Sequence, residues 1–359
     1  MSWKHSGGGS LGEAGAEDGA LVAAAQAGDE PAFTELVERH RRELRVHCYR
    51  MLGSFEESED LVQETFLRAW RGRETFQGRS TFRAWLYRIA TNACLDFLDR
   101  HPRHPRPRET GQDPHGASPP AEIPWLQPYP DRLLEPIASG DAEPDAAAVG
   151  RETIELAFLA ALQHLPPGQR AALILRDVLG WPAKETAALL ETSVDSVKSA
   201  LKRARSTLRT HLPERRLEWA PSTVPTARER ELLQRFMDAH EQADPAALVE
   251  LLSEDVRMTM PPYPFWVSGR EAVRAFAAHA FGPDSPLHRG RWRNVPTRAN
   301  RQPAVAGYIR LPGAPAYRAQ VLNVLRIEDG KIVEVTVFEP HLLTAFGLPP
   351  ELPPDGDPF

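Results

Sequence analysis

The sequence has few cysteines, no long apolar run and little net charge. Its 359 residues include two cysteines, Cys48 and Cys94, without a CxxC spacing, which argues against a disulfide framework and predicts reduced, buried thiols. No apolar run approaches the ~20 residues of a membrane span, and the N-terminus lacks a signal-peptide pattern. We therefore expect a cytoplasmic protein without a membrane partner.

The formal net charge of −6 argues against a protein that coats nucleic acid through bulk electrostatics. The charge is unevenly distributed, however. Arginine and lysine are concentrated in residues 68–108 and 198–216, whereas residues 139–155 and the N-terminal leader are acidic. Nucleic acid therefore stays open as a partner for two local surfaces.

The chain divides into helical, linker and mixed segments. Hydrophobic residues make up 42% of it, enough for two or three domains. The predicted segments are a disordered leader (1–28), a helical bundle (29–100), a proline-rich linker (101–150), a second helical unit (151–212), a short linker (213–225), a mixed domain (226–348) and a tail (349–359). The predicted fold class is multi-domain: two all-α domains, a helical bundle and a helix-turn-helix, joined by a long linker and followed by an α+β cone.

The first helical block contains an amphipathic helix that begins near Ser58. Its predicted buried stripe consists of Leu61, Val62, Phe66, Leu67 and Trp70. The opposite face carries Glu59, Asp60, Gln63, Glu64 and Arg68. That face is either simply solvated or a docking surface for a basic partner helix.

Aromatic and cationic residues interleave in the next segment, FQGRSTFRAWLYRIATN at residues 76–92. Rings can stack on the bases of single-stranded DNA while guanidinium groups hold its phosphates. The candidate DNA-binding residues of this pattern are Phe76, Gln77, Arg79, Ser80, Arg83, Trp85 and Arg88. Alternatively Trp85 belongs to the core and the arginines to the surface, and one helix has room for both arrangements.

These two segments resemble a known family. The run DLVQETFLRAW at 60–70 is similar to the polymerase-binding helix of extracytoplasmic-function sigma factors, and TFRAWLYRIATN at 81–92 resembles their promoter-melting helix. The resemblance implies that Asp60, Gln63 and Glu64, with Arg68 beside them, face core RNA polymerase. It also implies that the loop 76–80 binds a flipped base of the minus-ten element of promoter DNA, and that Asn92 and nearby helix residues read the upstream edge of that element.

The second helical block predicts a helix-turn-helix. Pro182 suits the start of one helix, and Ser193 is a good N-cap for the next. The exposed face of the second helix presents Ser196, Lys198, Ser199, Lys202, Arg203 and Arg205, which suits reading of the major groove. Many regulators share this motif, and a solvated helical hairpin is the alternative. The block also resembles the minus-thirty-five-reading domain of the same family, and its position after the melting helix favours a sigma factor.

The long linker contains the motif WLQPYPD at residues 125–131, a Trp and a Tyr embedded in prolines. Such a segment is pre-extended and can dock in a groove, although it can also be a chance apolar stretch. It resembles a motif of sigma factors that carry a C-terminal SnoaL-like domain. We therefore expect it to contact another part of the chain or the polymerase.

The C-terminal segment predicts helices followed by an antiparallel sheet, and it resembles the SnoaL-like, NTF2-like superfamily. Polar candidates for the interior of its cone are His240, Asp255, Tyr263, His279, Asn323 and Glu339. No pair among them has a spacing that assigns an acid and a base, and fold alone does not confer catalysis. No catalytic residue, cofactor or metal is therefore assigned.

The leading hypothesis is a non-enzymatic sigma factor whose partners are core RNA polymerase and promoter DNA. Its C-terminal domain would be a regulator that inhibits in part, because a tethered domain can cover a DNA-binding face at high effective concentration. The alternatives are an active isomerase or cyclase that the helical part targets to DNA, and a repressor with a ligand domain. An anti-sigma factor and a small-molecule ligand of the C-terminal domain stay open.

Overall fold

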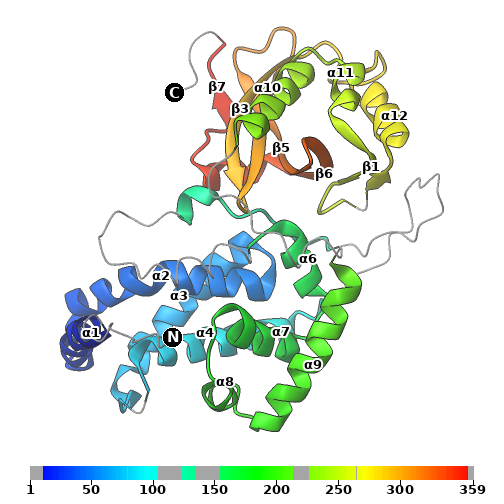
Figure 1. The fold of residues 1–359 in the computed structure, drawn as a ribbon. Coiled ribbons are helices and arrows are strands. Elements are labelled where there is room, and N and C mark those ends of the chain that lie inside the picture. Colours follow the sequence, from blue (N-terminus) through cyan, green and yellow to red (C-terminus); the bar gives the residue numbers. More distant parts are fainter. Residues whose placement is uncertain are drawn as a thin grey trace, which may run out of the picture. The chain divides into compact units, whose positions relative to one another are not determined.

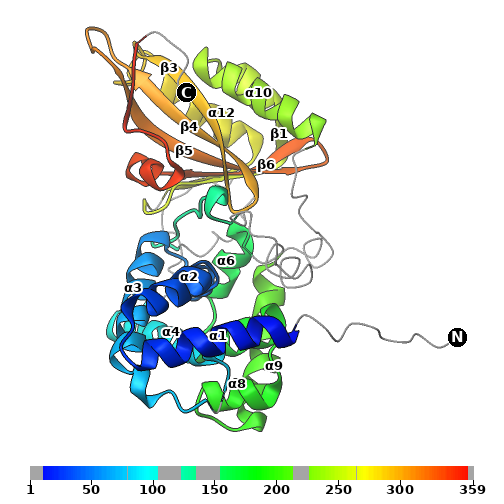
Figure 2. The same cartoon turned by 90° about the vertical axis from the view of Figure 1, so that its left-hand side faces the viewer.

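The computed structural model describes residues 11–78, 80–103, 123–134, 154–212, 226–263 and 265–354, with side chains from Gly19 onward. These residues form two compact units (Figures 1 and 2). The first unit combines residues 1–103 with 165–207, and the second combines residues 104–164 with 208–359. No helix in the described ranges is long and apolar enough to cross a membrane.

The first unit is helical. It contains α1 (Leu11–Gln26), α2 (Glu30–Leu52), α3 (Phe55–Arg71), the short η1 (Arg73–Thr75), α4 (Phe82–Arg100), α7 (Pro167–Leu173), a π-helical turn η3 (Ile174–Val178), α8 (Ala183–Leu189) and most of α9 (Val194–His211). Side-chain caps set several starts. Ser54 caps α3 by accepting from the Glu57 N–H, so this helix begins before the predicted Ser58, and Thr81 caps α4 in the same way.

The prediction of a disordered leader is wrong for Leu11–Gln26, which forms helix α1. Helix α1 packs against α2, and Val22 and Ala25 are buried. The Gln26 side chain donates hydrogen bonds to the carbonyls of Phe76 (2.7 Å) and Arg73 (3.3 Å). A few apolar residues at helical spacing are enough to dock this segment, despite its glycine-rich composition.

The first predicted promoter module and residues 165–207 of the second pack together inside the first unit. Arg170 at the start of the second module is 3% exposed and donates to the carbonyls of Met51 and Leu165. Burial lowers the pKa of its guanidinium to about 9. Trp181 lies against Tyr87 of α4, with ring centroids 5.2 Å apart. The same core contains Cys48 and Cys94 as buried free thiols, which confirms the prediction.

The second unit has a seven-stranded sheet. Its elements are α10 (Ala227–Glu241), α11 (Pro245–Glu250), β1 (Leu252–Thr259), β2 (Trp266–Ser268), α12 (Arg270–Phe281), β3 (Arg291–Ala299), β4 (Gln302–Arg310), β5 (Tyr317–Glu328), β6 (Lys331–Phe338), η5 (Pro340–Phe346) and β7 (Glu351–Leu352). The strand order is β2-β1-β6-β5-β4-β3, with β7 beside β5. Strands β1 and β6 run parallel, so the expected fully antiparallel sheet is wrong for that pair.

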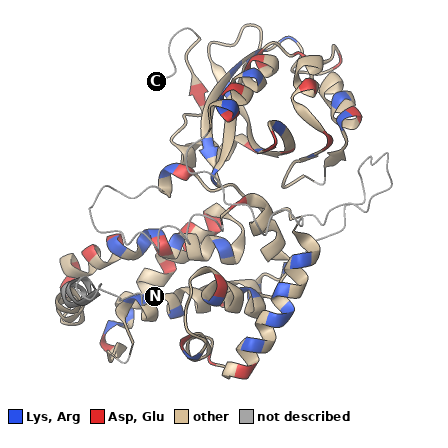
Figure 3. Ribbon diagram, viewed as in Figure 1, with Lys and Arg blue, Asp and Glu red and all other residues tan. Residues whose placement is uncertain are grey.

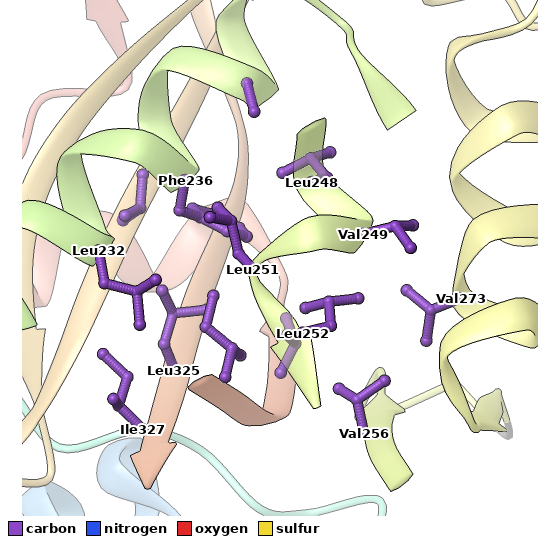
Figure 4. Close-up of a cluster of buried hydrophobic side chains, with 14 of the residues drawn as sticks. Leu232, Phe236, Leu248, Val249, Leu251, Leu252, Val256, Val273, Leu325 and Ile327 are labelled. Atoms are coloured by element: carbon purple, nitrogen blue, oxygen red, sulfur yellow. The ribbon is translucent and has the colours of Figure 1, made fainter. Parts of the chain in front are cut away.

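One face of this sheet packs on the helices. Leu232 and Phe236 of α10, Leu248 of α11 and Val273 of α12 meet Leu325 of β5 in one buried cluster (Figure 4). Burial of these apolar side chains stabilises the domain by about 25 cal/mol per Å² of surface removed from water. Helix α6 (Leu156–Gln163) and the short η2 (Asp131–Leu133), both from before α10 in the chain, belong to the same unit.

Candidate functional site

The predicted polymerase-binding residues share one face of α3. Asp60 and Gln63 are exposed, and Glu64 and Arg68 are half-buried, which is the i, i+3, i+4 pattern of a single helix face. Leu67 lies among them and is 50% exposed, so its prediction as a buried residue is wrong. Leu67 lies seven residues after Asp60, which is about two helical turns. This spacing could have predicted that both residues share one face. Leu67 therefore adds an apolar side chain to this polar face.

Arg68 orders this face. Its Nε donates to Glu64 Oε1 at 2.7 Å, and its Nη1 donates to Asp96 Oδ2 of α4 at 3.0 Å. Hydrogen bonds from Glu64 and Asp96 raise the pKa of Arg68 above its ordinary value. The contact fixes the direction of Glu64 and joins α3 to α4.

In the loop before α4, one aromatic side chain packs on two others from the helix. Phe76 is half-buried, and its ring centroid lies 5.7 Å from Phe82 and 5.3 Å from Trp85. The hydrogen bond from Gln26 to the Phe76 carbonyl holds the backbone at this point. Gly78, at φ +66, turns the chain where a side chain would be strained. Gln77 and Ser80 are exposed, and Arg79 lies outside the described residues.

The DNA-binding candidates on helix α4 differ in how far they are packed or paired within the protein. Trp85 is 6% exposed and its ring packs against Phe76, so the structure favours the alternative that places Trp85 in the core. Arg83 pairs with Glu43 of α2 at 2.7 Å and lies over the Tyr87 ring. Arg88 is exposed and Asn92 half-buried.

Glu43 holds Arg83 in place. Burial would raise the pKa of Glu43, but hydrogen bonds with His40 and Arg83 outweigh it and bring the pKa below its ordinary value. The Arg83 guanidinium is therefore oriented along the helix before any ligand arrives.

The predicted recognition helix α9 has an open basic face, visible as a row of blue along the ribbon (Figure 3). All five of its predicted DNA-binding residues are exposed: Ser196, Lys198, Ser199, Lys202 and Arg203. The Ser193 hydroxyl accepts from the Ser196 N–H at 3.1 Å, which confirms the predicted cap. Lys198 pairs with Asp195, whereas Arg205 forms two hydrogen bonds with Asp177 and so fixes α9 against η3.

The linker motif docks on the C-terminal domain, at the turn between β3 and β4. Tyr129 is fully buried and exchanges two hydrogen bonds with Asn300, from Tyr129 N to Asn300 Oδ1 (2.7 Å) and from Asn300 N to the Tyr129 carbonyl (2.9 Å). Asp131 accepts from the Arg301 N–H at 2.8 Å and from Arg298 Nε at 3.1 Å. The predicted contact of this motif within the chain is confirmed.

The same turn also holds the entry to α6. Asn300 Nδ2 donates to the Ile154 carbonyl at 2.6 Å, and Gln302 Oε1 accepts from the Leu156 N–H at 3.4 Å. Asn300 and Arg301 have positive φ, +55° and +63°, as a two-residue hairpin requires. Asn300 is fully buried, and this one turn residue bonds both Tyr129 and Ile154, which lie 25 residues apart in the sequence.

The cone interior differs from the prediction. Asp255 and His279 are exposed, and Tyr263 is 51% exposed, with its hydroxyl bonded to Glu339 at 2.8 Å. Only His240 and Asn323 of the six candidates are buried. Burial lowers the pKa of His240 to about 4, so the ring is neutral at pH 7. No group of His, Cys, Asp or Glu in the described part of the chain suits a metal ion.

Three family models match the chain. Sigma-70 region 2 covers residues 36–104, sigma-70 region 4 covers 155–208, and the SnoaL-like domain covers 233–335. The crystal structure of the extracytoplasmic-function sigma factor SigJ of Mycobacterium tuberculosis aligns with a TM-score of 0.54 at 24% identity. This alignment covers 87% of this chain and 98% of SigJ, and it supports the fold.

Curated relatives carry the comparison further. The ECF RNA polymerase sigma factor SigG of Mycobacterium tuberculosis is 41% identical over 342 residues, which cover 92% of this chain and 89% of SigG. The ECF RNA polymerase sigma factor SigM of the same organism is 32% identical over 191 residues, which cover 53% of this chain and 82% of SigM. The chain therefore belongs to the extracytoplasmic-function RNA polymerase sigma factors of the sigma-70 family, with a SnoaL-like domain fused at its C-terminus.

Proposed function

We propose that this sigma factor is regulated by its own SnoaL-like domain, which holds the linker between the two promoter modules. The factor directs promoter-specific initiation of transcription, working on DNA in the cytoplasm. The exposed face of α3, with Leu67 at its centre, is the surface for core RNA polymerase. The Phe76 loop with Arg88 binds the minus-ten element, and the basic face of α9 binds the minus-thirty-five element.

The compact first unit supports a closed state. The two promoter elements lie about 25 base pairs apart, which is about 85 Å of duplex at ~3.4 Å per base pair. A compact unit of roughly 150 residues has a radius of gyration of only about 15 Å. The Phe76 loop and α9 belong to one such unit, through the contacts of Arg170 and Trp181. The modules must therefore separate before both elements are bound.

The linker between the two promoter modules sets how far apart they can move. An extended chain spans at most ~3.5 Å per residue, so every residue held on another surface shortens its reach. The β3–β4 turn holds both Tyr129–Asp131 and Ile154–Leu156, and it thereby removes the intervening segment from the available length. This double attachment is the observation that carries the proposal, and it makes the SnoaL-like domain inhibitory.

The attachment includes a buried carboxylate. Burial raises the pKa of Asp131, although the Arg301 N–H and Arg298 act in the opposite direction. Its two partners thus offset only part of the cost of burying the carboxylate, and the hydrogen bonds of Tyr129 with Asn300 hold the same attachment.

We further propose that the SnoaL-like domain is not an enzyme. Apolar side chains from α10, α11, α12 and β5 fill the space between the helices and the sheet (Figure 4). The two buried polar candidates are His240 on α10 and Asn323 on β5. Neither of the two carboxylates among the candidates, Asp255 and Glu339, is buried. That set offers no acid–base pair for isomerase or cyclase chemistry.

The test uses the full-length protein and Asp131→Lys, which places a like charge against Arg298. We measure core polymerase binding and open-complex formation on a promoter library. We expect Asp131→Lys to form open complexes several-fold faster, with unchanged polymerase affinity. Asp284→Lys makes the same charge change at an exposed position of the same domain and should match the wild type. Equal or slower opening by Asp131→Lys would reject the inhibitory role.

A further inference from the structure

We propose that the docked linker and the SnoaL-like domain together form a binding site for a small organic carboxylate with an apolar body. The structure has a cavity of about 350 Å³ at their junction. Its walls come from three places: the linker with Asp131 and Arg132, α10 with Arg230 and Leu233, and the β3–β4 hairpin and η5 with Arg298 and Phe346. The volume is at the small end of the range for ligand sites.

The charges on these walls leave an excess of cations. Asp131 is already paired with Arg298 and the Arg301 N–H. Glu229 is occupied in the capping box of α10, where its Oε2 accepts from the Thr226 N–H at 2.7 Å. Both carboxylates of the cavity therefore have partners within the protein, and the site attracts rather than repels an anion.

Two guanidinium groups stay open to a ligand. Arg230 is exposed and makes no side-chain hydrogen bond or ion pair within the described ranges. Arg132 uses its Nε to bond the Ala345 carbonyl at 2.9 Å, which anchors the side chain along η5 and leaves its terminal nitrogens as donors. Guanidinium groups from two sides match the two oxygens of a carboxylate.

The remaining walls are apolar. Leu233, Phe346, Pro296 and Pro303 offer carbon surface beside the arginines. A bare inorganic ion would leave that surface in water, whereas an aromatic or aliphatic carboxylate covers it. The combination of apolar walls with a few convergent polar groups is typical of small-molecule sites.

Because the linker supplies one wall, the site is complete only while the linker is docked. A ligand that binds this state and not the undocked one stabilises docking by mass action. At a concentration 100 times its dissociation constant it shifts the docking equilibrium about 100-fold. Its effect on transcription rests on the inhibitory role proposed above, whereas its binding does not.

The experiment uses full-length protein and a panel of probes: benzoate, phenylacetate, indole-3-acetate, hexanoate and octanoate, each beside its neutral amide. Binding is measured by calorimetry, and amide hydrogen exchange of residues 126–134 is followed by mass spectrometry. We expect at least one carboxylate to bind with a dissociation constant below about 1 mM and to slow that exchange, while its amide does neither.

Variants locate the site. Arg230→Gln should weaken binding at least ten-fold. Arg228→Gln is the matched control on the same helix, because Arg228 bonds the Asp329 carbonyl and does not line the cavity. Asp131→Lys should abolish binding by undocking the linker.

Three results would overturn the proposal: no carboxylate binds, the amides bind equally well, or Arg230→Gln and Arg228→Gln behave alike. The two proposals fail separately. If Asp131→Lys speeds open-complex formation but no probe binds, the regulatory role stands and the site is rejected. If a carboxylate binds and slows exchange but Asp131→Lys leaves transcription unchanged, the site stands and the regulatory role is rejected.

Discussion

Asp131 of the linker and Arg298 of the SnoaL-like domain, 167 residues apart in sequence, form an ion pair with an Nε–Oδ2 distance of 3.1 Å. The carboxylate side is almost fully buried, with 6% of the Asp131 side chain exposed, against 26% for Arg298. The pair thus joins the segment between the promoter modules to the domain that follows them. The cost of burying the carboxylate reduces the net free energy that this ion pair contributes. Its main effect is therefore to position the linker on the domain.

A first prediction separates position from charge at this contact. Asp131→Asn keeps an acceptor for the Arg301 N–H and avoids burying a charge, so we expect the linker to stay docked at pH 7. Asp131→Ala removes both acceptors, and amide exchange in residues 126–134 should rise at least ten-fold, which corresponds to about 1.4 kcal/mol. Faster exchange in Asp131→Asn than in Asp131→Ala would contradict this account.

A second prediction concerns the polymerase surface of α3. Leu67→Asp should weaken binding to core RNA polymerase by ten-fold or more, because an apolar anchor is replaced by a charge. Stability should change little, since the side chain is 50% exposed. Thr34→Asp, at an exposed position on α2, is the control. The measurement is a binding titration beside a denaturant melt, and equal affinity of the two variants would rule out Leu67 as an anchor.

A third prediction follows from the hydrogen bond between α1 and the Phe76 loop. Gln26→Glu replaces the donor to the Phe76 carbonyl with an acceptor, so the loop loses its fixed backbone. We expect affinity for single-stranded minus-ten DNA to fall about three- to ten-fold, which is the effect of one to two modest hydrogen bonds. Ala27→Gln, one residue further on and exposed, should have no effect. Fluorescence anisotropy with a labelled oligonucleotide provides the test.

A fourth prediction contrasts two cations of α9. Lys202 is open, so Lys202→Ala should weaken duplex binding and reduce the slope of log affinity against log salt by about 0.9, the value for one phosphate contact. Arg205 is already bonded twice to Asp177. Arg205→Ala should therefore leave the salt slope nearly unchanged. If both variants reduced the slope equally, the division of α9 into an open face and an anchoring face would be wrong.

A fifth prediction concerns acid stability. The pKa of His240 is lowered by burial to about 4, below its ordinary 6.5, so unfolding lets the ring take up a proton. The stability that comes from the neutral ring is fully present above pH 6.5 and is lost as pH falls towards 4. For this residue alone the loss between pH 7 and pH 5 is about 2 kcal/mol. Denaturant unfolding of the SnoaL-like unit at both pH values should show a smaller loss for His240→Asn.

The sequence by itself determined the local structure. Helical spacing and caps such as Ser193 act over a few positions, and they predicted helices of both promoter modules. The motif at residues 60–70 placed Asp60, Gln63 and Glu64 on one exposed face for the same reason. Composition misled at α1, because its few apolar residues gain their stability from α2 and not from their own segment.

The tertiary structure decided what depends on distant partners. Periodicity assigned Leu67 to the core and left Trp85 divided between core and surface, because the burial of a side chain at the edge of a helix face depends on which neighbour packs there. The docking of Tyr129 and Asp131 on Asn300 and Arg298 joins residues about 170 positions apart. No local pattern specifies such a contact, since its free energy comes from burial and hydrogen bonds that exist only once both surfaces have folded.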